Sequence, residues 1–308
     1  MKNLSEIQIY DLEEDYQLEK ADYKEFSKYY ATYCGLQKED NYFKKSYEMM
    51  RSSVSEDDGC FWIVKNHKKI GGVFIESNYI EGLFLIPPYN NEYEILKKLK
   101  NALIKWSDLS KPIIASVVDS SQIDIYEKLG FKKFESGRWM IRITEIISDN
   151  LNEKYDICLP KRENEVEMGK LLYEAFENND GLNFKYSLEE YTSWVKDYFD
   201  DNLENDFLNR ASTLVYDKET KELVGLCYIS IFQEWPLISQ IAVKPSYQGR
   251  GIGSDMIKKS LTNLSEKYPV VRLYVDIGNE AENVYYNLGF MKGVELSEME
   301  LKVMENNI

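Results

Sequence analysis

The stretch from Pro236 to Ser254 reads PLISQIAVKPSYQGRGIGS, and its pattern predicts a strand, a loop and the start of a helix. Three glycines, Gly249, Gly251 and Gly253, let the backbone turn without Cβ atoms in the way. Successive N–H groups can then point into one concavity at the start of the helix, where the helix dipole also favours negative charge. The stretch therefore predicts a phosphate-binding loop.

Two other interpretations of this loop compete with a simple phosphate site. In a Rossmann dinucleotide site, Ser254 would replace the third glycine and Asp276 would bind the ribose. The glycines of that motif follow the strand almost directly, whereas Lys244 to Gln248 intervene here. Few residues remain after Asp276 to complete such a sheet. The other interpretation is a glycine-rich loop that only caps a helix and binds nothing.

The chain repeats itself around this stretch. Residues 125–133, IYEKLGFKK, match residues 284–292, VYYNLGFMK, and Pro112 matches Pro269 ahead of them. Each half predicts two strands joined by a polar turn, then a third strand, an amphipathic helix, a buried strand and a short helix. This order predicts an α/β fold (an α+β mixed sheet) that is present twice.

A polar run at 148–154 separates the two halves, so we expect domains at 1–149 and 150–308. The segments before each repeat core, roughly 11–55 and 160–210, are charged and are expected to be helical. The two cores are expected to contain two early strands and one helix each, at 61–64, 72–75 and 95–103 and at 213–216, 224–232 and 257–264.

Composition argues against several classes of function. The formal net charge of −15 opposes DNA, RNA or an anionic membrane as partner. The one histidine, His67, lies in a polar run that predicts a hairpin turn, which argues against a Ser-His-Asp triad and a zinc site. The four cysteines form no CxxC pair, so no disulfide framework is expected. Without a long apolar run or a signal peptide, we expect a cytoplasmic protein with no membrane span.

The loop QGRGIG at 248–253 resembles the Gln/Arg-x-x-Gly-x-Gly/Ala signature with which GCN5-related N-acetyltransferases (GNATs) hold the pyrophosphate of acyl-CoA. The run Ile241-Ala242-Val243 precedes the loop as in that family, and Tyr285 lies four residues before Gly289, as its late helix requires. With its two related halves, the chain resembles a tandem GNAT protein of the mycothiol synthase kind. The resemblance implies two tandem GNAT acyl-CoA N-acyltransferase folds.

The resemblance also implies the chemistry of the second half, which is acetyl transfer from acetyl-CoA to an amine without a metal. Tyr285 is implied as the general acid to the leaving thiolate, with a core aromatic as the alternative. A backbone N–H near Ile241 or Ala242 is implied as the donor to the thioester oxygen. The residues implied for acetyl-CoA are Ile241, Ala242, Val243, Gln248, Gly249, Arg250, Gly251, Ile252, Gly253, Ser254, Asn279 and Tyr285.

Three parts of this assignment depart from the family pattern or stay open. The family's usual Asn lies seven residues before the tyrosine, where this chain has Gly278, so capping is the alternative role of Asn279. Glu234 is our candidate for the general base, with Asp276 or a water chain as alternatives. In the first half the equivalent loop, residues 85–93, lacks glycine and carries Glu92, so we do not expect it to hold CoA.

The acceptor is predicted to be a primary amine, either small and cationic or a peptide N-terminus, because acids and aromatic residues alternate before the second repeat core. The alternative is an ordinary solvated helix face over a core stripe, and the alternative function is a catalytically silent CoA-binding scaffold. The acids are Glu174, Glu177, Asp180, Glu189, Glu190, Asp197, Asp200, Asp201, Glu204 and Asp206. The aromatic residues are Tyr173, Phe176, Phe184, Tyr186, Tyr191, Trp194, Tyr198 and Phe199.

Overall fold

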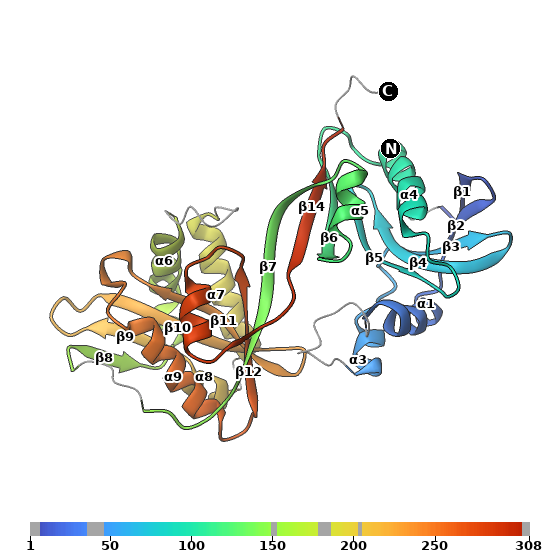
Figure 1. Cartoon of the computed structure of the whole chain (residues 1–308). Helices are drawn as coiled ribbons and strands as arrows, with labels where there is room; N and C mark the ends of the chain where they lie inside the picture. Colours follow the sequence, from blue (N-terminus) through green and yellow to red (C-terminus); the bar gives the residue numbers. More distant parts are fainter. Residues whose placement is uncertain (1–6, 36–45, 149–152, 178–185, 203–204, 304–308) are drawn as a thin grey trace. The chain divides into compact units, whose positions relative to one another are not determined.

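The computed structural model describes residues 7–35, 46–148, 153–177, 186–202 and 205–303. The chain forms two compact units: unit 1 is Met1–Gly137 with Val294–Ile308, and unit 2 is Arg138–Gly293. Each unit has a β-sheet with helices on both faces, as the repeat predicts (Figure 1). In the described part of the chain, no helix has the length and apolar character needed to cross a membrane.

The sheet of unit 1 has the strand order β1-β2-β3-β4-β5-β6-β14-β7. Its strands are β1 (Ile9–Glu13), β2 (Tyr16–Lys20), β3 (Cys60–Lys65), β4 (Lys68–Glu76), β5 (Tyr79–Leu85), β6 (Ile113–Asp119), β14 (Leu296–Leu301) and the first half of β7 (Lys132–Ile143). Its helices are α1 (Tyr23–Tyr30), the π-helical turn η2 (Ala31–Gly35), α3 (Tyr47–Ser52), α4 (Glu92–Trp106) and α5 (Ile123–Lys128).

The sheet of unit 2 has the order β7-β12-β11-β10-β9-β8, and β13 also pairs with β7. Its further strands are β8 (Tyr155–Cys158), β9 (Thr213–Asp217), β10 (Leu223–Phe232), β11 (Trp235–Val243), β12 (Val270–Asp276) and β13 (Met291–Lys292). Its helices are η3 (Arg162–Asn164), α6 (Glu165–Phe176), α7 (Leu188–Asn202), α8 (Asp206–Ala211), η4 (Pro245–Tyr247), α9 (Ile252–Leu264) and α10 (Ala281–Asn287).

The two sequence halves exchange their last strands. In unit 1, β14 lies beside the first half of β7, with Leu296 opposite Gly137 (Figure 1). In unit 2, the second half of β7 pairs with β13, with Met291 opposite Ile141. The compact units therefore differ from the predicted domains 1–149 and 150–308, because strand pairing over a long sequence distance decides which unit a segment joins. Within the predicted border, residues 149–152 lie outside the described residues.

Most of the expected elements are confirmed, with one correction at the start of the chain. The expected strands lie in β3, β4, β9 and β10, and the expected helices lie in α4 and α9. Residues 9–20 form a hairpin and not a helix. Its turn residues Glu13, Glu14 and Asp15 all have positive φ, and Tyr16 and Leu18 are buried at alternate positions. His67 lies in the β3–β4 turn with φ +62°, as predicted.

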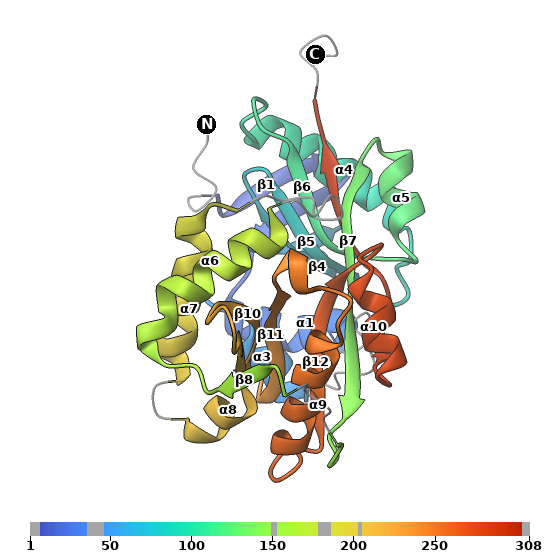
Figure 2. The same cartoon turned by 90° about the vertical axis from the view of Figure 1, so that its left-hand side faces the viewer.

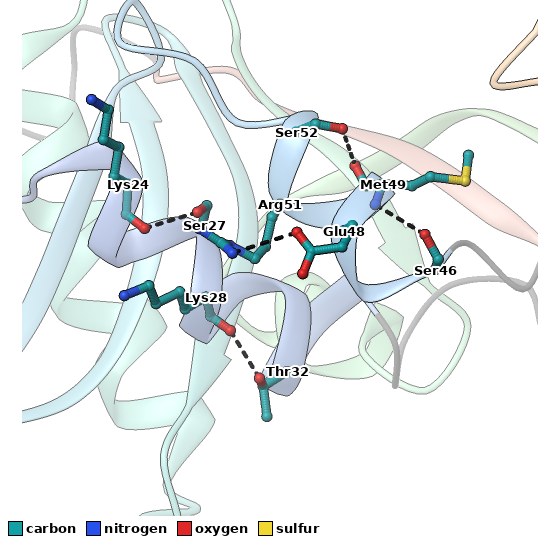
Figure 3. A network of polar contacts seen from close by, with 9 residues as sticks. All are labelled: Lys24, Ser27, Lys28, Thr32, Ser46, Glu48, Met49, Arg51 and Ser52. Carbon is teal, nitrogen blue, oxygen red and sulfur yellow. Dashed lines mark hydrogen bonds and ion pairs between the residues drawn. The ribbon is translucent and has the colours of Figure 1, made fainter.

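In unit 1 the two faces of the sheet have separate cores. Apolar residues of α4, including Leu96 and Leu99, pack on one face, and Phe26 of α1 packs against Trp62 and Phe84 on the other. The helices on that second face have side-chain caps and local hydrogen bonds (Figure 3). Ser46 Oγ accepts a hydrogen bond from the Met49 N–H (3.1 Å) at the start of α3.

In unit 2, α8, α9 and α10 share one core on one face of the sheet, and α6 and α7 form another on the opposite face (Figure 2). Leu261 of α9 packs with Val271 and Leu273 of β12 in the first core. Val195 of α7 packs with Leu226 and Ala242 in the second. Both cores anchor β10 and β11, the strands that lead to the glycine loop, and the first core also anchors β12.

Candidate active site

The glycine loop connects β11, through η4, to α9, which begins at Ile252. Gly249 and Gly251 have φ values of +74° and +83°, in the left-handed region that favours glycine. A Cβ atom added at Gly249 would find no atom within 4 Å, and one at Gly253 would lie 3.7 Å from Val243 Cγ2. The glycines therefore shape the turn and leave open space beside it.

The first turn of α9 offers hydrogen-bond donors to that space. No side chain caps the helix at Gly251. The N–H groups of Ile252, Gly253 and Ser254 belong to the first turn and have no intrahelical acceptor. Asp255 adds a carboxylate there, but Lys258 Nζ lies 2.9 Å from it and offsets its charge. An uncapped helix start with open space fits a phosphate group.

Two side chains of the loop hold it against the end of the strand. Gln248 Nε2 donates to the Val243 carbonyl (3.2 Å), and Arg250 Nη2 donates to the Ser246 carbonyl (2.7 Å). The Arg250 guanidinium also lies 4.6 Å from the centre of the Tyr247 ring. These contacts fix the backbone, so the glycine turn does not depend on a ligand for its shape.

The strand before the loop separates from its parallel neighbour. Among the described residues, β11 and β12 pair at Leu237 and Arg272. Beyond this pair the two strands diverge. β11 continues from there to Val243 and β12 continues to Asp276. We call the space between these unpaired strand ends the gap.

The register decides which main-chain groups face this gap. The Lys244 N–H donates to the Val224 carbonyl on β10 (2.9 Å), and Ala242 lies opposite Leu226. Hydrogen-bonding direction alternates along a strand, so the N–H and carbonyl of Ala242 also point to β10. The N–H of Ile241 therefore points into the gap. Of the two donors predicted from the sequence, Ile241 has the required direction and Ala242 does not.

Tyr285 lies in α10 in the core of unit 2. It is buried, and burial raises the pKa of its hydroxyl, with a smaller contribution from Cys227. Its ring centre is 6.1 Å from that of Phe290, and the repeat pair Tyr126 and Phe131 in unit 1 has a similar spacing of 5.4 Å. The phenol is therefore a neutral donor at physiological pH, and its role as general acid remains a prediction.

The two carboxylates considered as the general base lie at different ends of the gap. Glu234 is exposed in the β10–β11 turn with φ +69°, before β11 begins. Asp276 ends β12, four residues beyond Arg272, just as Ile241 lies four residues beyond Leu237. The register shift of β11 at Ser239 means that equal residue counts do not place Ile241 and Asp276 level with each other. Burial raises the pKa of Asp276.

Asn279 lies one residue before Glu280, the N-cap of α10. Its Oδ1 accepts a hydrogen bond from the Ala281 N–H (2.9 Å), and its own N–H donates to the Asp276 carbonyl (3.2 Å). Asn279 therefore supports the turn that leads into α10, which favours the capping interpretation. A contact of Asn279 with CoA remains a prediction.

Sequence reasoning missed Arg272, a buried cation at the closed end of the gap. Its Nη2 donates to the Phe232 carbonyl, and its guanidinium lies 5.6 Å from the Trp139 ring and 5.5 Å from the Phe232 ring. Burial lowers its pKa to about 10. The one signal in the sequence is a charged residue inside the apolar strand 270–276, but its partner Trp139 lies in the other sequence half.

In unit 1, the loop that corresponds to the glycine loop leads into a helix start that a side chain caps. Asn91 Oδ1 accepts from the Glu94 N–H (3.3 Å) at the start of α4, and Glu92 and Glu94 lie in the first turn. Gln122 Nε2 donates to Glu92. A capped helix start with two carboxylates disfavours a phosphate, in agreement with the expectation that this loop does not hold CoA.

The helices before the second core have buried aromatic residues and exposed acids. Tyr191, Tyr198 and Phe199 are buried in the core beneath α6 and α7, and the Arg162 guanidinium lies over the Phe199 ring at 5.8 Å, so none of the three presents an exposed ring face to a ligand. Acids on α7 that are exposed include Glu189, Glu190, Asp197 and Asp201. The core-stripe interpretation is thus confirmed for these three rings. Asp180, Phe184 and Glu204 lie outside the described residues.

We compared the chain with known protein families and with known proteins, and the family match includes the glycine loop. Residues 183–300, which contain the glycine loop and Tyr285, match the family model described as an acetyltransferase (GNAT) domain. A Bacillus subtilis (strain 168) protein, described as a candidate ribosomal protein bS18-alanine N-acetyltransferase, is 29% identical over 121 residues. The match covers 37% of this chain and 77% of that protein.

Two solved structures are similar over nearly the whole chain. A GCN5-related N-acetyltransferase from Sphaerobacter thermophilus has a TM-score of 0.68 at 13% identity and covers 94% of this chain and 96% of its own. A tandem GNAT protein from the clavulanic acid biosynthesis pathway has a TM-score of 0.58 at 11% identity and covers 95% and 97%. At such identities these likenesses show the fold, and the predicted tandem GNAT fold is confirmed.

Proposed function

We propose that this protein is an acyltransferase that transfers an acetyl group from acetyl-CoA to a primary amine, because residues 183–300 match the model of an acetyltransferase (GNAT) domain. One observation carries the proposal: an open glycine loop at the start of α9 follows, after η4, a strand whose Ile241 N–H points into the gap beside β12.

The residues of unit 2 fit acetyl-CoA. The N–H groups of Gly249 to Ser254 would hold the pyrophosphate, because the space beside the glycines is open and the helix start is uncapped. The main-chain groups of Ile241 and Val243 would pair with the amide groups of the pantetheine arm. Acetyl-CoA supplies an activated thioester, and the Ile241 N–H would stabilise negative charge on its oxygen.

Two side chains would move the protons of the reaction. Tyr285 is a neutral phenol that would donate a proton to the departing thiolate. Asp276 would accept a proton from the amine, directly or through water, because it ends β12 beside the gap and its raised pKa makes it a better base than an ordinary carboxylate. Glu234, the first candidate from the sequence, is the alternative base.

The acceptor proposed is a small cationic amine or a peptide N-terminus. Exposed carboxylates on α7 support a cation, since they create negative potential on that side of unit 2. The name of the Bacillus subtilis relative, which includes an alanine of a ribosomal protein, supports a peptide N-terminus.

Release of free thiol from acetyl-CoA tests the proposal. The full chain is incubated with acetyl-CoA and, one at a time, spermidine, an aminoglycoside and a peptide with an N-terminal alanine, and the product is identified by mass spectrometry. Acetylation of at least one amine nitrogen is expected. Binding of acetyl-CoA without thiol release in the presence of any amine would instead favour the silent scaffold.

A further inference from the structure

Unit 1 repeats the strand separation of unit 2, and a small cavity lies at that place. Strands β5 and β6 pair at Tyr79↔Ile114 and Ile80↔Ala115 and then diverge. A cavity of about 30 Å³ lies between the diverging segments. It is lined by residues of β5, β6, α5 and the α1–η2 segment, among them Glu81, Leu83, Ser116, Gln122 and Tyr126.

The strand registers show that this cavity corresponds to the acyl-binding place of unit 2. Leu85 corresponds to Val243, because each lies opposite a glycine in the preceding strand of its own sheet. Counting back two residues matches Leu83, which lines the cavity, with Ile241, whose N–H faces the gap of unit 2. The cavity is thus a second gap of the same kind, in the unit whose phosphate loop is closed.

The cavity is rich in acceptors. Glu81 lines it and accepts a hydrogen bond from the Tyr79 hydroxyl. Just behind the wall, Glu298 Oε1 accepts from Ser116 Oγ (2.8 Å) and from the Val117 N–H (3.0 Å). No Lys or Arg is among the described residues that line the cavity. Among the described residues, two carboxylates and no cation lie at this cavity, which favours a positively charged ligand.

The chemistry of the walls narrows the class of ligand. A phosphate or CoA is disfavoured, because Asn91 caps α4 and carboxylates surround its first turn. A metal ion is also disfavoured, since no group of three or more His, Cys, Asp or Glu side chains is placed to hold one within the described ranges. An ammonium group, which donates several hydrogen bonds and carries positive charge, matches acceptors of this kind.

We propose that unit 1 binds a small organic amine, whose primary ammonium group enters this cavity and pairs with Glu81. A cavity of about 30 Å³ accommodates an ammonium group and little more, so the remainder of the ligand extends out of it. Tyr126, the counterpart of Tyr285, adds a phenol to the wall. This amine site is separate from acetyl transfer and does not require unit 2 to be active.

The test compares three four-carbon compounds that differ in their end groups, namely putrescine (amine), 1,4-butanediol (hydroxyl) and succinate (carboxylate). Each is titrated calorimetrically into the full chain without acetyl-CoA. Putrescine is expected to bind more tightly than the other two. In Glu81→Gln its affinity falls roughly 10- to 100-fold, the effect of losing one charge-assisted hydrogen bond. Glu76→Gln, an exposed carboxylate at the end of β4, is the matched control and leaves putrescine affinity unchanged.

The proposal is overturned if Glu81→Gln binds putrescine as tightly as the unmodified chain, because the amine is then held elsewhere. It is also overturned if succinate or 1,4-butanediol binds as well as putrescine, or if putrescine does not bind at millimolar concentration. Should Glu81→Gln fail to fold, Tyr126→Phe replaces it, since it keeps the buried ring and removes one hydroxyl. Weaker putrescine binding in this variant supports the site, and unchanged binding contradicts it.

Discussion

Leu237 lies opposite Arg272 on the parallel strands β11 and β12, and the two strands separate beyond this pair. Arg272 is fixed there by the Phe232 carbonyl and by the rings of Phe232 and Trp139. Trp139 belongs to β7, which starts in the first half of the sequence. The closed end of the gap is therefore fixed by residues from both sequence halves.

The double variant Gly251→Glu, Gly253→Glu should bind acetyl-CoA at least about 100-fold more weakly, because two charge-assisted hydrogen bonds, each worth about 1.5–3 kcal/mol, are lost and negative charge is added. Calorimetric titration gives the affinity, and the unmodified chain should show one site. Ser265→Glu adds one such charge at the other end of α9 and should bind acetyl-CoA normally. A stoichiometry of two would contradict the single site in unit 2.

Tyr285→Phe should lower kcat by about 10²–10⁴-fold and leave acetyl-CoA affinity unchanged, because a general acid acts mainly in the transition state. Single-turnover thiol release measures the rate. Tyr286→Phe is the matched control, since the neighbouring ring is 60% exposed. Equal rates in the two variants would assign Tyr285 to the core alone.

Asp276→Asn should slow the reaction by about 10²–10⁴-fold and remove the acid limb of the pH profile of kcat/KM. Burial raises the pKa of Asp276, and the protonated carboxyl cannot accept a proton, so activity should fall as the pH drops through that raised value. Glu234→Gln is measured beside it. If Glu234→Gln removes the limb and Asp276→Asn does not, the base is Glu234.

Met140→Ala should destabilise unit 2 by about 2–5 kcal/mol, because Met140 is 1% exposed in the core that also holds α9 and α10. Ile143→Ala on the same strand is the control, since Ile143 is 63% exposed and should change stability by no more than about 0.5 kcal/mol. The free energy of unfolding is measured by urea titration, with the loss of acetyl-CoA binding as the signal for unfolding of unit 2. Equal stability of both variants would show that β7 is dispensable for unit 2.

The value of kcat/KM for spermidine should decrease as the salt concentration increases, because the exposed acids of α7 attract a cation. Salt screens this attraction beyond a distance of about 8 Å at physiological ionic strength. Glycinamide, with a single charge, is the control acceptor and should show a weaker dependence. The same slope for both amines, or a preference for an anionic amino acid, would exclude attraction by these acids.

Local features of the fold could be predicted from the sequence. The glycines at 249 and 251 adopt the left-handed backbone that their spacing indicates, and the apolar spacing in α4 and α9 places the expected residues in the cores. Capping by Asn279 was also one of the interpretations that the sequence offered. In each case the local structure depends on residues that are close together in the sequence.

The remaining features depend on register between distant segments. A bulge between β10 and β11 and the pairing of Ala242 with Leu226 decide that Ile241 faces the gap, and periodicity does not reveal this. The burial of Tyr191 likewise depends on the packing of α6 against α7. The strand exchange is the largest such case, since β14 joins a sheet made almost entirely by the first half of the chain.

This exchange has a consequence for the order in which the protein is made. A ribosome synthesises residues 113–137 long before residues 296–301, yet β14 lies between β6 and β7 in the finished sheet. Unit 1 therefore cannot complete its sheet during synthesis of its own sequence and must wait until all of unit 2 has emerged. Until then the edge of β6 that pairs with β14 is open, and the nascent chain depends on residues 296–301 to close it.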